Sequence, residues 1–76
     1  MTQSQMLHRL KEAFPESAIN VYDLTGTEDH WEVHIESDKF KNLSRIRQHQ
    51  MVMQVFSEEL KTGEVHALTM KTKEKQ

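Results

Sequence analysis

The side chains that could carry chemistry in this sequence are its histidines, and His66 and His30 are the two candidates for a shared metal site. Imidazole binds metal ions and also exchanges a proton near neutral pH. His66 lies in residues 63–72, where a turn glycine precedes alternating apolar and polar residues, a pattern typical of a strand. The chain has no cysteine, which excludes disulfides, thiolate nucleophiles and sulfur ligands of its own.

His30 and His34 are not expected to bind one ion together. Both lie in residues 30–36, where Trp31, Val33 and Ile35 alternate with polar residues as in a half-buried strand. Four residues along a strand span roughly 13 Å, too far for one ion whose ligands lie about 2 Å away. His34 is therefore expected to be an ordinary residue of the polar face.

No pattern of residues indicates an enzyme. Ser44 and His49 are five residues apart, which does not place them on one side of a helical turn. Gly26 and Gly63 are the only glycines, too few for a phosphate-binding glycine loop. We therefore expect the protein to have no catalytic activity.

The sequence predicts six elements. They are a helix over residues 2–14, strands over 18–24 and 30–36, a short helical turn over 39–42, one long helix from 44 to 61 or 62, and a strand over 65–71. The long helix is expected to pack on the sheet through a stripe of apolar residues that also holds His49. That stripe consists of Ile46, Met53, Phe56 and Leu60, widened by Val52.

This order predicts an αββααβ fold of the α+β class. A long helical connection between the second and third strands suits a parallel crossover. The expected result is a three-stranded mixed sheet with helices packed on one face. Residues 1–76 should form a single domain in which 72–76 are a loose tail.

A parallel pairing of the last two strands would bring His30 and His66 to one edge of the sheet. Neighbouring strands lie about 4.8 Å apart, so one ion could reach both imidazoles. The alternation opposes this. His66 shares its strand face with Leu68 and Met70, whereas His30 lies on the face opposite to that of Trp31. Convergence is expected only if the loop over residues 25–29 turns His30 round.

A second candidate site is a cluster of positive side chains at the start of the long helix: Lys39, Lys41, Arg45 and Arg47. Cations near free helical amides would suit a nucleic-acid phosphate backbone. A solvated charged surface explains the same residues. The net charge of −2 and the pI of 6.2 argue against a globally basic nucleic-acid-binding protein.

The composition is that of a folded, water-soluble domain. Hydrophobic residues make up 36% of the chain and charged residues 29%. No apolar run is long enough for a membrane span, and the first residues lack the apolar segment of a signal peptide. A cytoplasmic protein is expected.

Four runs of the sequence, taken together, closely resemble the BolA-like proteins. They are residues 29–33 (DHWEV), 37–40 (SDKF), 43–52 (LSRIRQHQMV) and 65–72 (VHALTMKT). They occur in the order and spacing of that family and cover essentially the whole domain. The resemblance implies an αββααβ fold similar to the type II KH domain, in agreement with the order of elements.

The resemblance also implies a function in iron-sulfur cluster assembly or trafficking. BolA-like proteins pair with monothiol glutaredoxins around a bridging [2Fe-2S] cluster, to which the glutaredoxin cysteine and glutathione supply thiolates. The BolA-like partner supplies the histidine that matches His66. A second ligand comes from the loop before the second strand, where the matching residue is His30, so this sequence resembles the histidine-loop subgroup. No cofactor is expected in the isolated chain.

The alternative that the resemblance implies is a DNA-binding transcriptional regulator. Some BolA-like proteins are described as binding DNA through the segment that matches residues 39–51. In this sequence Gln48 and Gln50 stand where arginines are common. DNA binding and a homodimer of the isolated chain both stay open at this point.

Overall fold

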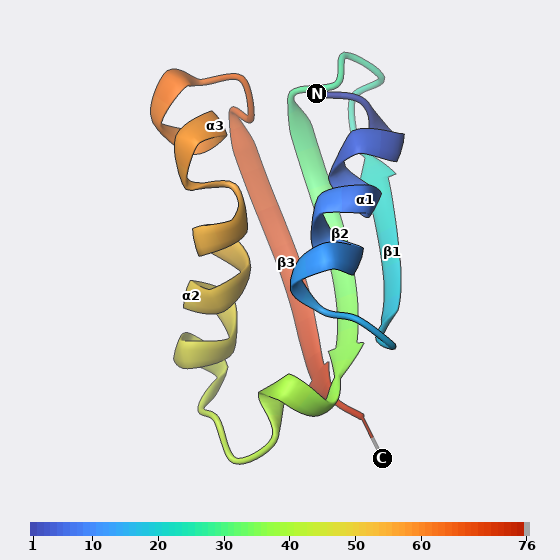
Figure 1. Cartoon of the computed structure of the whole chain (residues 1–76). Helices are drawn as coiled ribbons and strands as arrows, with labels where there is room; N and C mark the ends of the chain where they lie inside the picture. The colour runs from blue at the N-terminus through green and yellow to red at the C-terminus, as the bar shows by residue number, and fades with distance from the viewer. Residues whose placement is uncertain (76) are drawn as a thin grey trace.

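The computed structural model of the protein describes residues 1–75, which form a mixed sheet covered by helices (Figure 1). The elements are α1 (Gln3–Ala13), β1 (Ala18–Asp23), β2 (His30–Ser37), the 3-10 turn η1 (Asp38–Phe40), α2 (Arg45–Val55), α3 (Ser57–Thr62) and β3 (Ala67–Glu74). β2 is the central strand, antiparallel to β1 and parallel to β3. The predicted α+β fold with a three-stranded mixed sheet is confirmed.

The alternation in β2 decides which face of the sheet is buried. Trp31, Val33 and Ile35 are buried, whereas the residues between them are only half-buried. In Figure 1, α1 crosses in front of β1 and β2, and α2 runs alongside β3. The helices therefore cover the face of Trp31 and leave the face of His30 open, as expected from a period of two.

α1 begins and ends where its sequence predicts. The Thr2 hydroxyl accepts from the Gln5 amide at 3.1 Å, and the Gln5 side chain accepts from the Thr2 amide at 2.9 Å, which is a capping box. Phe14 closes the last turn just before Pro15, and the Lys39 ammonium donates to the Ala13 carbonyl at 2.8 Å. The buried side of α1 holds Met6, Leu10 and Phe14.

The predicted long helix is in fact two helices, and its predicted apolar stripe is confirmed at Val52 and Phe56 but wrong at Ile46 and Met53. The chain turns at Phe56 (φ −111°, ψ 23°), which ends α2 and precedes α3. Val52 and Phe56 are the buried residues, whereas Ile46 is 70% exposed and Met53 is 46% exposed. Because helical residues follow at about 100° each, the α2 face that packs on the sheet is rotated away from Ile46 and Met53.

β3 begins and ends later than predicted, because it spans residues 67–74 instead of 65–71. Residues 72–74 pair with the end of β2, up to the match of Glu74 with Ser37, so the prediction of a loose tail is wrong for them. Lys75 donates its amide to the Ser37 carbonyl at 3.2 Å. Gln76 lies outside the described residues. The three polar residues Thr72, Lys73 and Glu74 gave no apolar alternation from which a strand could be recognised.

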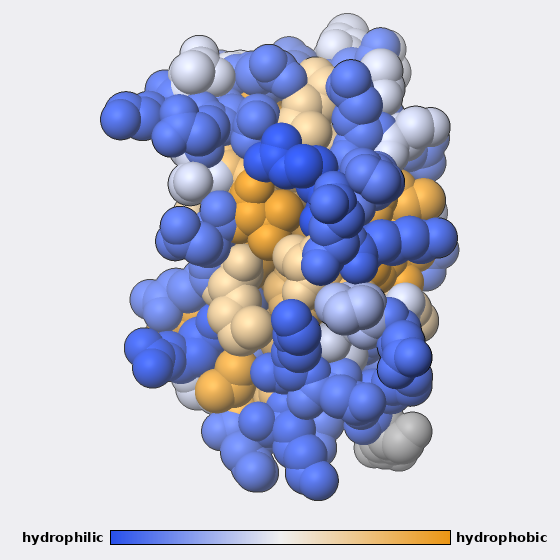
Figure 2. Space-filling model, in the orientation of Figure 1, coloured by the Kyte–Doolittle hydropathy of each residue, from blue (hydrophilic) through white to orange (hydrophobic). Residues whose placement is uncertain are grey.

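Apolar side chains reach the surface in the centre of the face seen in Figure 2, between the positions of α1 and α2, and polar side chains surround them. Part-buried hydrophobic residues such as Leu7, Met51 and Val55 pack against the core from the two helices.

No helix among residues 1–75 is long and apolar enough to cross a membrane.

Arg9 ties α1 to the junction of α2 and α3. Its guanidinium donates to both carboxylate oxygens of Glu59, at 2.9 and 3.1 Å, and to the Val55 carbonyl. The guanidinium also lies 5.5 Å from the centre of the Phe56 ring. The hydrogen bond from Arg9 lowers the pKa of the Glu59 carboxyl group below its ordinary value.

Replacing Arg9 by methionine is therefore expected to lower the free energy of unfolding by about 1–2 kcal/mol at neutral pH, since a charge-assisted pair in partial contact with water is lost. Because the folded-state pKa of Glu59 is depressed, its contribution is present above the unfolded pKa and is lost as the pH falls. Urea unfolding at neutral and acidic pH should show the gap between parent and variant narrowing in acid. A gap that is constant with pH would contradict the assignment.

Candidate functional site

The candidate site lies at the edge of the sheet where β2 and β3 begin. His30 is the first residue of β2 and is in register with Ala67, the first residue of β3, and His66 immediately precedes that residue. The ring centres of His30 and His66 are 5.1 Å apart, with the ring planes inclined at 46°. The structure thus brings together the two histidines that the sequence indicated, His66 exposed and His30 half-buried.

Regular alternation would place the two histidines on opposite faces of the sheet. The departure from that alternation occurs at His66, not at His30. The amides of His66 and Ala67 both donate to the Asp29 carbonyl, at 2.8 and 3.2 Å. Successive amides of a regular strand point to opposite sides, so the alternation is interrupted between these two residues. His30 keeps its regular place in β2. The expectation that the preceding loop turns His30 round is therefore wrong.

The loop over residues 24–29 is held by side chains at its two ends. The Asp23 carboxylate accepts from the Gly26 amide at 3.0 Å and from the Glu28 amide at 3.2 Å. Gly26 and Glu28 both have positive φ, of 76° and 61°, and the Leu24 amide closes the loop on the His30 carbonyl at 2.9 Å. Such aspartate-to-backbone bonds are typical of ordered turns.

Asp29 is a functional candidate that the sequence reasoning missed. Its carboxylate lies 2.9 Å from Nδ1 of His30 and also accepts from the Thr27 and Thr25 hydroxyls. The hydrogen bonds from Thr27 and His30 lower the pKa of Asp29 to about 2. An ionised carboxylate only accepts hydrogen bonds, so Nδ1 of His30 is the donor, and in the neutral ring Nε2 keeps its lone pair. The signal in the sequence was an acid directly before the histidine.

The separation of the two imidazoles fits a shared metal. Two rings bound through nitrogens about 2 Å from one tetrahedral ion have centres roughly 5 Å apart, and these are 5.1 Å apart. Among residues 1–75, no group of three or more histidine, aspartate or glutamate side chains could hold a metal ion. A four-coordinate metal bound by both histidines would therefore need further ligands from another molecule.

Comparison with known proteins decides the family. The profile described as BolA-like protein matches residues 4–76. The chain belongs to the BolA-like family.

Relatives and solved structures agree with this assignment. An uncharacterized protein of Rickettsia prowazekii, RP812, is 40% identical over 63 residues, which are 83% of this chain and 80% of that protein. Human BolA-like protein 3 is 45% identical over 65 residues, 83% of this chain, so the BolA-like domain described here matches 59% of the human protein's length. The structure of BolA1 from Arabidopsis thaliana superposes with a TM-score of 0.85 at 28% identity, over 95% of this chain and 89% of that one.

The four residues of the expected basic cluster, Lys39, Lys41, Arg45 and Arg47, are all exposed. The Lys39 ammonium lies against the end of α1, 6.0 Å from the Phe14 ring centre. Arg45 lines an open groove with two lysines of β3, Lys71 and Lys73. The groove joins Arg45 to two lysines that the sequence reasoning did not include in the cluster.

Gln48 holds the start of α2 in place. Its amide nitrogen donates to the Leu43 carbonyl at 3.0 Å, and its amide oxygen accepts from the Thr72 hydroxyl at 2.6 Å. Gln48 thus links the loop before α2 to β3.

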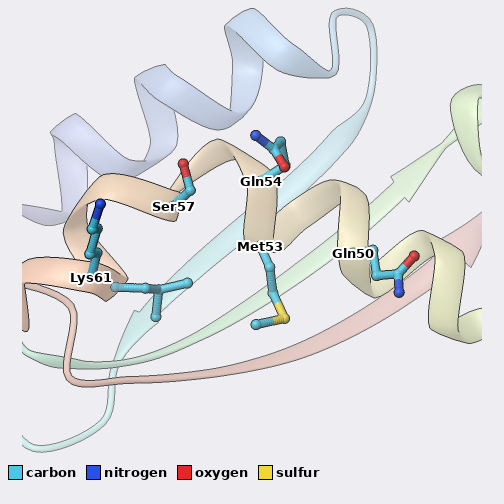
Figure 3. A pocket seen from close by; sticks show the side chains of 6 residues that line it. Gln50, Met53, Gln54, Ser57 and Lys61 are labelled. Atoms are coloured by element: carbon cyan, nitrogen blue, oxygen red, sulfur yellow. The ribbon is translucent and has the colours of Figure 1, made fainter.

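The other histidines lie away from the candidate site. His34 donates from Nε2 to the Glu32 carboxylate at 2.8 Å and packs against Tyr22, as expected for a residue of the polar strand face. His8 is exposed on α1, 3.1 Å from the Glu12 carboxylate. A hollow on α2 and α3 has no histidine in its lining: Figure 3 shows Met53 and Lys61 beside the neutral side chains of Gln50, Gln54 and Ser57.

Proposed function

We propose that this BolA-like protein holds a [2Fe-2S] cluster jointly with a monothiol glutaredoxin, as a non-catalytic adaptor in cluster assembly or trafficking. His66 and His30 would bind the cluster through nitrogen, and the glutaredoxin cysteine and glutathione would supply thiolates. The observation that carries the proposal is the pair of imidazoles, 5.1 Å apart at one sheet edge, in a chain that has no cysteine.

The exposure of His66 and the hydrogen bond made by His30 support the proposed shared cluster. His66 is exposed, and His30 has Nε2 free because its Nδ1 faces the Asp29 carboxylate. Two imidazoles supply only some of the ligands that a cluster needs, so a second protein would supply the others. When bound, imidazole ligands raise the reduction potential of a cluster and make its binding sensitive to protons. These properties favour transfer of the cluster over a permanent structural role.

The test is a titration of the protein with cluster-loaded monothiol glutaredoxin, followed by visible absorption and circular dichroism. The wild type is expected to change both spectra. His66→Ala should remove the change, and His30→Ala should weaken cluster retention by more than the 10–100-fold loss typical of outer-shell partners. His34→Ala, which removes a histidine from the same strand but not from the edge, should behave as the wild type.

Two outcomes would contradict the proposal: spectra that do not change with the wild type, or a His66→Ala variant indistinguishable from it. Binding of glutaredoxin that is indifferent to His66 would mark a protein interaction domain without a metal role.

A second candidate is DNA binding, favoured by the gathering of Arg45, Lys71 and Lys73 along one groove. Amide-shift mapping separates the two functions. Glutaredoxin should perturb the edge at His66, whereas DNA at low salt should perturb the residues around Arg45, with an affinity that falls steeply as salt rises.

A further inference from the structure

We propose that Asp29 is the positioning residue of the two-histidine site, orienting His30 through its side chain and His66 through its backbone carbonyl. The inference rests on the proposed function, because it concerns how the chain prepares its two nitrogen ligands. The residue is not itself assigned as a metal ligand. Its effect would be to hold both imidazoles in place before a partner arrives.

The side-chain half of the argument concerns which nitrogen of His30 is free. Nδ1 lies 2.9 Å from Oδ1 of Asp29, close enough for a hydrogen bond of normal length. The carboxylate can only accept, so the ring carries its proton on Nδ1 and presents the Nε2 lone pair. Histidines that bind metals almost always donate their other N–H to a carboxylate, carbonyl or water in this way. Without any side-chain partner at Nδ1, the ring would be a mixture of both tautomers.

Asp29 is itself held by the loop that precedes β2. The hydroxyls of Thr27 and Thr25 both donate to the same carboxylate oxygen that faces His30. Asp23, at the other end of the loop, fixes the Gly26 and Glu28 amides. The carboxylate is about two-fifths exposed, with a relative exposed area of 40%, so these bonds supply the fixed orientation that burial does not.

The backbone half concerns His66. The Asp29 carbonyl accepts from the amides of His66 and Ala67, at 2.8 and 3.2 Å. This double contact interrupts the strand alternation, and the ring of His66 lies beside that of His30 instead of on the opposite face. One residue therefore sets the position of both imidazoles, which come from segments 36 positions apart in the chain.

A second histidine–carboxylate pair in the same strand provides an internal comparison. His34 lies 2.8 Å from Glu32. Its register partner on β3 is Lys71, whereas His30 is in register with Ala67, the residue next to His66. The pairing of a histidine with a carboxylate is therefore not enough to make a site. What distinguishes Asp29 is that the paired histidine faces a second imidazole.

The experiment compares Asp29→Asn with the wild type and with Glu32→Gln. In the isolated chains, long-range ¹H–¹⁵N NMR at about pH 8.5, where imidazole is neutral, reports the tautomers. The wild type should show His30 with its proton on Nδ1. Asp29→Asn is expected to shift it towards Nε2, because an amide can donate to Nδ1, as in the aspartate-to-asparagine change of a serine-protease triad. Glu32→Gln should alter His34 and leave His30 unchanged.

The second measurement is the rate at which a chelator removes the cluster from the complex with monothiol glutaredoxin. Asp29→Asn should raise this rate about 10–100-fold, whereas Glu32→Gln should match the wild type. If the wild type forms no cluster complex, the proposed function fails and the inference fails with it. If the wild type and His66→Ala behave as proposed but Asp29→Asn keeps the wild-type tautomer or rate, only the inference is overturned.

Loss of structure is tested with a second variant, Asp29→Ala, which removes the carboxylate without adding an amide donor. It should leave His30 as a mixture of tautomers and also accelerate cluster loss. If circular dichroism shows that both Asp29 variants are unfolded, Asp29 is a residue of the fold and not of the site, and the inference is wrong.

Discussion

Replacing Trp31 by alanine is expected to lower the free energy of unfolding by about 3–5 kcal/mol, enough to unfold a large fraction of a domain of this size. Trp31 has no exposed surface and lies in the central strand, in register with Asp23 on one side and Leu68 on the other. Its removal would leave a cavity between the sheet and the helices. Urea unfolding followed by far-ultraviolet circular dichroism measures the loss.

Phenylalanine at the same position separates the volume of the side chain from its polar atom. Nε1 of Trp31 is buried and has no hydrogen-bond partner among the described residues. An unpaired buried donor costs about 1–3 kcal/mol, so its removal offsets part of the lost packing. Trp31→Phe is therefore expected to cost less than about 2 kcal/mol. If Trp31→Phe costs as much unfolding free energy as Trp31→Ala, this expectation is wrong.

Trp31 also bears on the histidine edge, because it follows His30 directly. In a strand, neighbouring side chains point to opposite faces, so burial of Trp31 on the helix side forces His30 to the open side. The phenylalanine variant keeps this constraint. It should therefore retain the His30–His66 arrangement and the response to glutaredoxin, which makes it a suitable control for variants that lose function through unfolding.

The sheet could be predicted from the sequence because its central strand has a simple period. Trp31, Val33 and Ile35 alternate with polar residues without interruption, and their burial follows that alternation. The parallel pairing of the last strand followed from the length of the helical connection. Both inferences depend on patterns that extend over several residues, and such patterns survive one or two irregular positions.

The candidate site could be predicted in its members but not in its geometry. His66 and His30 were placed at one edge by strand order alone. Their approach depends on a local irregularity, in which two successive amides donate to the carbonyl of Asp29. Hydrophobic periodicity does not report such a contact, because any residue type has the carbonyl. The carboxylate of Asp29 was visible beside His30, but its hydrogen bond required the structure.

The packing side of α2 could not be predicted because the sequence offers two apolar stripes. Ile46 and Met53 are seven residues apart and define one stripe, whereas Val52 and Phe56 define another about 100° away. The turn at Phe56 has neither glycine nor proline, the residues by which a helix break is usually recognised.

Alanine at Phe56 and at Met53 distinguishes the two stripes by experiment. Phe56 has no exposed surface and packs at the junction of α2 and α3 beneath the Arg9 guanidinium. Phe56→Ala is expected to cost about 3–5 kcal/mol of unfolding free energy through the cavity that it leaves. Met53 is 46% exposed and borders the open hollow of Figure 3, so Met53→Ala should change stability by less than about 1 kcal/mol.

Ile46→Ala is the matched control at the start of the same outer stripe. Ile46 is 70% exposed, and its truncation should likewise change stability by less than about 1 kcal/mol. Urea unfolding of the three variants against the wild type gives the comparison directly. Comparable losses at Met53 and Phe56 would mean that α2 packs through the stripe of Ile46 and Met53 as well as through that of Phe56. If only Phe56→Ala loses much unfolding free energy, α2 packs through the inner stripe. The Arg9 contact that attaches α1 then lies on that stripe.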